Sequence, residues 1–418
     1  MILKFTIRNL LKHPFLNLVK VIGLSLALSG LLIIALYLKN ELSYDHYHKK
    51  SNRIYRYTFT SEDFFGGKHF ARIVSASYIP QMTEYFPEIE SYVRLVRIRG
   101  NFIKKKEQFI EVNQAFQVDS TFFKIFDCKL LTGDPENILN EPGTMVITES
   151  YANKVFGDEN PIGQVLTLPK GQFYAENTDF TVKGIMKDFP INNHFHPDFI
   201  TTPHDKSAFN SWAWVYLLLT ENANPDNILS NFLDFGSTIW NVDKNEVKMV
   251  PHLQNIRDIH LHSDKLREIE PNGDLTVIYT ISIAAFLLLF IALINYANLN
   301  VGMAGFSDKF VFINKLSVSK QKITLKHYLF EGFIVYLAVL LISYFLTIVA
   351  NIVIQNHFGI NFLEGEIITI FIIVILFGLL SILASIAPIY KLLFSKVNSA
   401  LNFKNITNIK RKGISKGL

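Results

Sequence analysis

Two pairs of histidines are the residues of this sequence whose type and spacing most directly suggest chemistry. His194 and His196 are two positions apart, and so are His260 and His262. On a β-strand, residues i and i+2 point to the same face, so each pair could offer two imidazoles to a metal ion such as zinc. However, the first pair follows a proline-containing turn, and no acidic residue has a spacing that is diagnostic of a further ligand. Structural hydrogen bonding is the other interpretation of both pairs.

Other enzyme signatures are missing from the sequence. Gly66-Gly67-Lys68 is followed by His69 and lacks the spacing with which backbone amides cradle a phosphate, so we expect no ATP hydrolysis by this chain itself. It contains no His-Glu-x-x-His, Cys-x-x-Cys or Gly-x-Ser-x-Gly motif. Cys128 is its only cysteine and is expected to be a small buried residue. The sequence therefore predicts no enzyme, no cofactor and no metal, and a membrane-anchored metalloenzyme based on the histidines is the weakest alternative.

Four apolar stretches are long enough to cross a bilayer as helices, which takes ~20 residues each: residues 18–38, 275–299, 329–354 and 367–389. Residues 39–274 have an ordinary globular composition and are numerous enough to form a domain with its own core. The first stretch could be a cleaved signal peptide, because basic residues precede it. Its apolar run is longer than that of a signal peptide and no small-x-small cleavage site follows, so we interpret it as an uncleaved helix.

Positive charge alternates along the chain and predicts its topology. Residues 1–20 and 300–328 each carry a net charge of +4, and residues 391–418 carry +7, whereas the whole chain is only +5. Basic segments remain on the cytoplasmic side of a membrane. Both termini and the loop 300–328 are therefore expected in the cytoplasm of a bacterial inner membrane, and residues 39–274 and 355–366 in the periplasm. Topology explains the basic pI, so no nucleic-acid partner is expected.

The segments between the apolar stretches have recognisable local patterns. Residues 1–17 predict a cytoplasmic amphipathic segment, unless their periodic basic residues are only a positive flank, and residues 390–418 form a basic tail. Within residues 39–274, alternation at Ile54–Thr60 predicts a half-buried strand, and Asp226–Phe235 predicts a helix. We therefore expect a membrane protein with four transmembrane α-helices and a large α+β extracytoplasmic domain inserted between helices 1 and 2.

Two amides lie in the second apolar stretch. Asn295 and Asn298 are three residues apart and share one face of a helix. Amides inside a membrane usually bond to another helix. Alternatively, both lie at the level of the lipid headgroups.

Several short motifs follow one another in a fixed order along the chain. They include Glu41-Leu42-Ser43-Tyr44-Asp45, Val118-Asp119-Ser120-Thr121-Phe122-Phe123, Phe156-Gly157-Asp158-Glu159-Asn160-Pro161-Ile162-Gly163, Lys187-Asp188-Phe189-Pro190, Asp258-Ile259-His260-Leu261-His262 and Glu270-Pro271-Asn272-Gly273-Asp274. In this order and spacing, the chain resembles the MacB/FtsX-like ABC transporter permeases with a MacB-type periplasmic core domain, in the form common in Bacteroidetes. The likeness extends almost from end to end.

The resemblance implies a permease subunit that works by mechanotransmission. A separate cytoplasmic ABC ATPase would open and close, and the helices would relay this movement to the periplasmic domain for efflux or extrusion of an envelope molecule. A single four-helix unit would need a second permease in the lipid bilayer, as a homodimer or a heterodimer. The resemblance also implies that both histidine pairs are ordinary positions of the core domain. It does not identify the cargo.

The loop 300–328 departs from the family pattern. In relatives, the part that rests on the ATPase reads approximately Arg-Ala-Lys-Glu-Val-Gly-Ile-Arg-Lys-Val-x-Gly-Ala. Here Lys309, Ile313 and Lys315 match that pattern, but Phe310 stands at the glutamate position and Phe312 at a glycine position. As a short helix, this segment would place an apolar face between lysines, a surface that fits a groove on a partner. Either the ATPase has changed to match, or the chain is a degenerate, non-transporting envelope scaffold or sensor.

Overall fold

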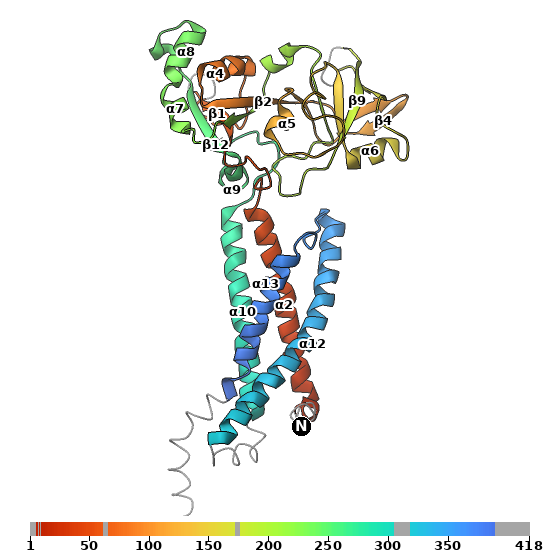
Figure 1. Ribbon diagram of the computed structural model, residues 1–418, viewed down its shortest axis with the longest axis vertical. Helices are drawn as coiled ribbons and strands as arrows, with labels where there is room; N and C mark the ends of the chain where they lie inside the picture. Colours follow the sequence, from red (N-terminus) through yellow and green to blue (C-terminus); the bar gives the residue numbers. More distant parts are fainter. Residues whose placement is uncertain are drawn as a thin grey trace, which may run out of the picture. The chain divides into compact units, whose positions relative to one another are not determined.

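The computed structural model describes residues 6, 8, 10–61, 66–171, 176–304 and 318–388. The chain divides into two units, one formed by Met1–Asn40 with Thr276–Leu418 and the other by Glu41–Leu275. The first unit consists of long helices, and the second of strands with short helices (Figure 1). This arrangement confirms the predicted fold class of four apolar helices with an α+β domain after the first of them.

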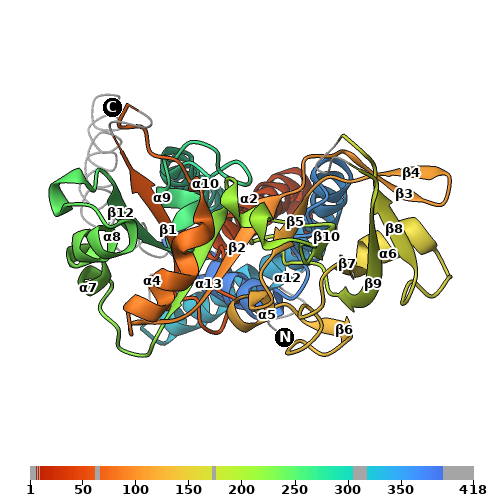
Figure 2. The same ribbon diagram turned by 90° about the horizontal axis from the view of Figure 1, so that it is seen from above.

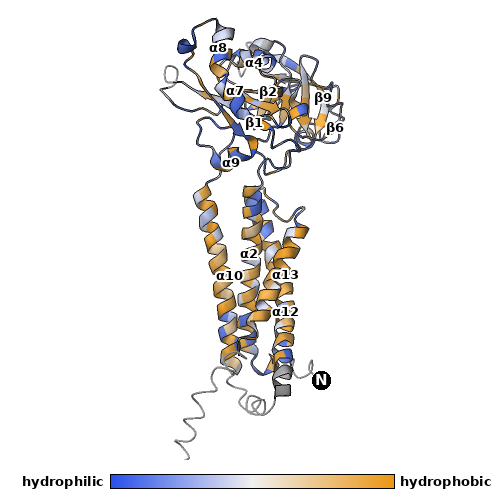
Figure 3. Ribbon diagram, turned by 60° about the vertical axis from the view of Figure 1, so that its left-hand side comes forward, coloured by the Kyte–Doolittle hydropathy of each residue, from blue (hydrophilic) through white to orange (hydrophobic). Residues whose placement is uncertain are grey.

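The helices of the first unit are long and apolar enough to cross a membrane. They are α2 (Pro14–Leu42), α10 (Leu275–Ala304), α12 (Val318–Phe358) and α13 (Ile367–Ala384). Figure 3 shows that most of their residues are hydrophobic, and large side chains such as Leu341 and Phe371 are 75% and 62% exposed. Lipid tails can cover such surfaces without the free-energy cost that water would impose.

Two glycines allow α12 and α13 to approach each other closely. A Cβ atom on Gly378 would lie 2.6 Å from the ring of Tyr336, and one on Gly332 would lie 2.6 Å from the hydroxyl of Ser385. The Tyr336 hydroxyl donates a hydrogen bond to the Val374 carbonyl of α13. Small residues at helix crossings and hydroxyls that bond across them are typical of packing in membranes.

The α+β domain is built on a mixed sheet of twelve strands, in the order β12-β1-β11-β2-β5-β10-β7-β9-β8-β3-β4, with β6 paired to β9. Figure 2 shows β3 and β4 at one end of this sheet and β1 and β12 toward the other. The strands are β1 (Ile54–Thr60), β2 (Ile89–Arg97), β3 (Phe102–Lys105), β4 (Gln108–Glu111), β5 (Ala115–Val118), β6 (Leu130–Thr132), β7 (Thr144–Thr148), β8 (Val165–Leu168), β9 (Thr178–Met186), β10 (Phe199–Thr201), β11 (Trp214–Leu219) and β12 (Val250–Asn255).

Strand β1 has the predicted bounds but is not half-buried. Tyr57 and Arg56 point to opposite faces of the sheet, and both are 0% exposed. Tyr57 packs in an aromatic core, and Arg56 forms an ion pair with Glu268, whose Oε1 accepts from Nη2 at 2.9 Å. The alternating pattern was misleading because an arginine with an internal carboxylate partner can be buried as fully as an apolar residue.

Short helices cover the sheet: α4 (Ile79–Tyr85), α5 (Phe122–Ile125), α6 (Glu149–Phe156), α7 (Pro225–Ser230), α8 (Phe232–Trp240) and α9 (Ile259–His262), with 3₁₀ turns η1 (Ala76–Tyr78), η2 (Lys206–Asn210), η3 (Lys244–Glu246) and η4 (Ile256–Asp258). The single helix predicted at Asp226–Phe235 is wrong, because the chain breaks between α7 and α8. At the break, the backbone of Asn231 has dihedral angles outside the helical range, and its side-chain amide donates a hydrogen bond to the Asn227 carbonyl at 2.8 Å. Asparagine side chains compete in this way with helix continuation.

Candidate functional site at the two ends of the α+β domain

The first and last residues of the α+β domain are joined through one histidine. His260, in α9, places Nε2 2.8 Å from a carboxylate oxygen of Glu41, and its ring stacks on Tyr44 with 3.3 Å between the ring centres. The carbonyl of His260 accepts a hydrogen bond from the amide of Gly273 at 2.9 Å. Glu41 begins the domain in the last turn of α2, and Gly273 lies two residues before α10. The chain therefore enters and leaves the domain at one polar junction.

Gly273 fits this junction only because it has no side chain. A Cβ atom there would lie 2.7 Å from Nε2 of His260 and 3.0 Å from the carboxylate of Glu41. Both distances are shorter than normal contacts of a methyl group. The glycine thus allows the ion pair and the chain end to occupy the same small space.

Replacing Gly273 by alanine should destabilise the full chain by about 1–3 kcal/mol, the usual penalty for an overpacked site, because the methyl group must separate Glu41 from His260. Thermal unfolding of the purified protein in detergent would measure the change. Gly302→Ala in α10 is the matched control, since a Cβ atom there meets nothing within 4 Å. Equal melting temperatures for both variants would contradict the steric argument.

A second histidine connects the start of the domain to its core. Asp45 is fully buried and accepts a hydrogen bond from Nδ1 of His194 at 2.8 Å. Nε2 of His194 lies 2.7 Å from the Tyr216 hydroxyl, which donates to it when the imidazole is neutral. Asp45 also adopts a left-handed backbone conformation with φ of 59°, and its amide donates to the Asn192 carbonyl. These bonds hold the segment that follows α2 against strand β11.

His196 lies between two hydrogen-bond acceptors. Its Nδ1 is 2.9 Å from Glu270, and its Nε2 is 3.0 Å from the Pro190 carbonyl. Both nitrogens can donate only if the ring is an imidazolium. Burial alone would lower the pKa of His196, but the hydrogen bond and charge of Glu270 outweigh it and the pKa is raised. Burial would raise the pKa of Glu270, but its bonds with His196 and with Gln114 outweigh it and the pKa is lowered.

The His196–Glu270 pair should make stability fall as pH rises above neutrality. Because the folded pKa of His196 is raised above 6.5, its contribution is complete below 6.5 and is lost as pH rises through the folded pKa. The pKa values of buried His48 and of partly buried His69 are lowered to about 4, so these groups act at lower pH. Wild-type protein should melt at a lower temperature at pH 8.5 than at pH 6.5, and His196→Gln should reduce this difference. If the melting temperature of His196→Gln falls between pH 6.5 and pH 8.5 by as much as that of the wild type, His196 is not the cause of the pH dependence.

The geometry required for metal binding by the histidine pairs is not met. His260 and His262 lie in helix α9, where residues i and i+2 do not face the same way, and His194 and His196 lie between β9 and β10. His194, His196 and His260 each have a carboxylate partner within 3.0 Å. Within the described ranges, no group of three or more His, Cys, Asp or Glu side chains could hold a metal ion. The interpretation as structural hydrogen bonding fits these contacts.

The other residues singled out in the sequence lie elsewhere. Asn295 and Asn298 are on the exposed side of α10. Lys309, Phe310, Phe312, Ile313 and Lys315 lie outside the described residues. Cys128 is partly buried, and burial together with the charge of Asp188 raises the pKa of its thiol to about 12.

A cluster of ionisable side chains inside the helical unit was not predicted. Lys20 of α2 is only 2% exposed, and its Nζ lies 5.9 Å from the ring centre of Tyr296 in α10. Glu331 and His327 of α12 are 5% and 7% exposed, with 3.5 Å between their charged atoms. Among the described residues, neither Nζ of Lys20 nor Oε2 of Glu331 has a hydrogen-bond partner. Buried ionisable groups in membrane helices are costly and usually mark function.

The family of the chain follows from its first half. The model of the MacB-like periplasmic core domain matches residues 18–232, more than half of the chain. The chain belongs to this family. With its four apolar helices, it is a multi-pass membrane protein that carries the MacB-like core domain of ABC transporter permeases. Permeases of this kind generally work with ABC ATPases.

Solved structures with partial similarity have related names. A domain named as that of a permease protein from Porphyromonas gingivalis has 19% identity, covers 56% of this chain and 99% of its own, and gives a TM-score of 0.41. The periplasmic region of MacB from Actinobacillus actinomycetemcomitans has 13% identity, with coverage of 50% and 91% and a TM-score of 0.35. The extracellular domain of the noncanonic ABC-type transporter YknZ from Gram-positive bacteria has 11% identity, with coverage of 48% and 100% and a TM-score of 0.35. No curated protein matches the chain.

Proposed function

We propose that this chain is the membrane subunit of an ABC transporter, in which a separate cytoplasmic ATPase drives the helices and the helices move the MacB-like core domain. The transported molecule would be exported or extruded from the envelope. The family assignment supports a permease. The polar junction supports the mechanical role, because it ties together the two points at which the chain enters and leaves the core domain.

The junction is the observation that carries this proposal. Ion pairs and hydrogen bonds join Glu41 and Gly273 through His260, and Asp45 to the domain core through His194. Unpaired, glycine-rich chain ends would absorb a helix movement, whereas chain ends that are bonded to each other and to the domain core would carry it into the domain. Movement of α2 against α10 would therefore change the core domain in this proposal.

The chain would act with a second permease, either another copy or a different subunit. The exposed amides Asn295 and Asn298 support α10 as part of that contact, since amides that face lipid in a single chain can bond to a neighbouring helix. Apolar side chains such as Phe290 are also exposed on α10. An obligate pair in the membrane would cover this face.

The alternative function is a scaffold or sensor that keeps the permease fold without ATPase coupling. It is favoured by the sequence of the loop, where Phe310 and Phe312 replace a glutamate and a glycine of the family pattern. Purification of the tagged full chain in mild detergent, followed by mass spectrometry, separates the two functions. A co-purifying ABC ATPase whose turnover depends on this chain supports the permease, and absence of any ATPase supports the scaffold. The chain alone should not hydrolyse ATP.

The proposed topology places both termini in the cytoplasm and the core domain in the periplasm. Single cysteines at Asn245 and Ser415 in a Cys128→Ser background would test it, because Asn245 is exposed in the α+β domain. An impermeant maleimide applied to intact spheroplasts should label position 245 and leave position 415 unlabelled until the membrane is opened. The reverse pattern would overturn the topology.

A further inference from the structure

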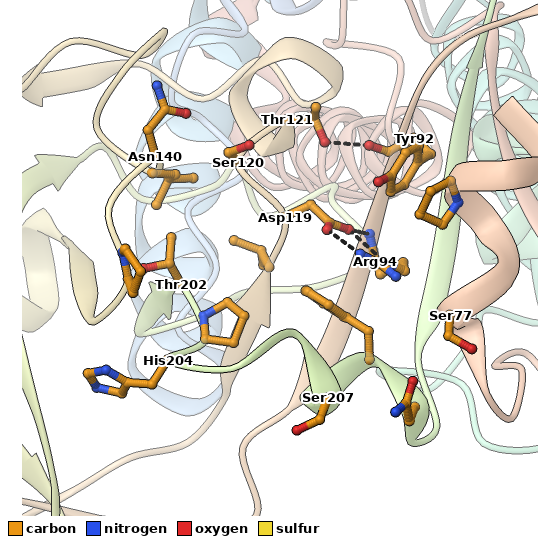
Figure 4. Close-up of a pocket in the computed structure, with 17 residues that line it drawn as sticks. Ser77, Tyr92, Arg94, Asp119, Ser120, Thr121, Asn140, Thr202, His204 and Ser207 are labelled. Carbon is orange, nitrogen blue, oxygen red and sulfur yellow. Dashed lines mark hydrogen bonds and ion pairs between the residues drawn. The ribbon is translucent and has the colours of Figure 1, made fainter. Parts of the chain in front are cut away.

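A polar cavity in the α+β domain lies outside the junction. It has a volume of about 730 Å³ and lies between strand β2, the turn that follows β5, and the chain around η2 (Figure 4). Small-molecule sites usually measure about 300–1,000 Å³, so this cavity could hold a ligand of several rings. The proposed coupling role makes no use of it.

Among the described side chains that line the cavity, the permanent charges are those of Arg94 and Asp119, and they neutralise each other: Nη2 and Nε of Arg94 donate to the two carboxylate oxygens at 2.7 and 2.9 Å. The remaining Nη1 donates to the Ala76 carbonyl, and the guanidinium lies 3.8 Å from the ring centre of Phe209. A charged ligand would lose its hydration without gaining a partner here. The cavity therefore favours a neutral ligand.

Several polar groups in the cavity wall are uncommitted. Three side-chain groups have no hydrogen-bond partner in the described part of the chain: the hydroxyls of Tyr92 and Ser120 and the side-chain amide of Asn210. Nε2 of His204 faces the Asp179 carbonyl at 3.1 Å and must donate to it, so the neutral ring leaves Nδ1 as an acceptor. These groups offer donors and acceptors to hydroxyls or amides of a ligand.

Rigid apolar rings alternate with these polar groups. Pro80, Pro142, Pro203 and Phe209 all line the cavity. Such rings lose little conformational freedom when they contact a ligand. Phe209 is 2% exposed and packs against the Arg94 guanidinium, so the apolar surface open to a ligand comes mainly from the prolines. Next to hydroxyl and amide groups, this surface complements a sugar ring, which has apolar C–H faces and polar hydroxyl edges. A short free peptide fits less well, because its charged ends find no partner.

We propose that this cavity binds a short, uncharged oligosaccharide, either free or as part of an envelope glycoconjugate. The cavity lies wholly within the α+β domain. The inference goes beyond the coupling role and does not depend on an ATPase.

Saturation-transfer NMR on the full chain in lipid nanodiscs tests this assignment, with maltotriose and chitotriose as neutral probes and tetra-alanine as a zwitterionic probe. At least one trisaccharide should receive saturation from the wild-type protein. The double variant Tyr92→Phe with Ser120→Ala removes two hydroxyls that make no bond within the fold, and it should weaken binding about tenfold. Tyr85→Phe is the matched control, because Tyr85 is exposed outside the cavity and should leave binding unchanged.

If a free trisaccharide binds and the same sugar on a lipid-linked carrier does not, the ligand is a free oligosaccharide. The reverse result would identify a glycoconjugate. Either result supports the proposal that the cavity binds an uncharged oligosaccharide. Three results would overturn the proposal. The first is that neither trisaccharide binds, and the second is that binding is unaffected by the double variant and so occurs elsewhere. The third is that tetra-alanine binds as tightly as the sugars and is weakened equally by the double variant, which would make the cavity a peptide site.

Discussion

Replacing Phe310 and Phe312 together by alanine should weaken the binding of the partner ATPase roughly a hundredfold or more. Burying one phenylalanine side chain in a groove contributes ~2 kcal/mol, and each 1.4 kcal/mol changes a dissociation constant about tenfold. Both phenylalanines lie in sequence between Lys309 and Lys315, in the part of the loop 300–328 that departs from the family pattern. Titration of the ATPase onto the purified full chain would measure the change.

Phe371→Ala is the matched control for this experiment, because Phe371 is a lipid-facing phenylalanine of α13, 62% exposed and far along the chain from the loop. Unchanged affinity in the double variant would mean that Phe310 and Phe312 insert into the headgroup region instead of a protein groove. If the wild-type chain binds no ATPase at all, the coupling role fails and the degenerate scaffold takes its place.

Removing one charge from the cluster inside the helical unit should destabilise the protein strongly. Lys20 and Glu331 interact electrostatically and are each at least 95% buried, so Lys20→Met would leave the carboxylate without its compensating charge. Loss of one member of a buried pair costs about 3–5 kcal/mol when the other remains charged. We expect a loss at the lower end of this range, because neither atom has a hydrogen bond to the other. Glu331→Gln should behave similarly.

The double variant Lys20→Met with Glu331→Gln should be more stable than the sum of the two single effects predicts, since neither charge then remains uncompensated. Lys12→Met is the control, because Lys12 is exposed. Thermal unfolding of all four variants in one detergent would provide the comparison. Additive losses would show that the two charges act independently, and no loss in either single variant would show that both side chains reach polar surroundings.

Much of the architecture could be predicted from local pattern alone. A membrane-spanning helix satisfies its own backbone hydrogen bonds and must be apolar along its length, so the four spans are visible in the sequence. Strand β1 and helix α6 also have strong local signals, including the glycine with φ of 56° that ends α6. The family motifs carried the resemblance because their order along the chain is itself sequence information.

Contacts between distant residues were decided only by the tertiary structure. Glu41 and His260 are 219 residues apart, and nothing local indicates that a carboxylate in the last turn of α2 meets an imidazole in α9. Arg56 lies in an alternating pattern that predicts a half-buried strand, and Lys20 was counted in the sequence only as one of the basic residues that set the topology. Both are buried, because internal partners or neighbouring helices surround them in three dimensions. Periodicity reports which side chains prefer water, whereas the burial of a charge depends on which partner the fold brings to it.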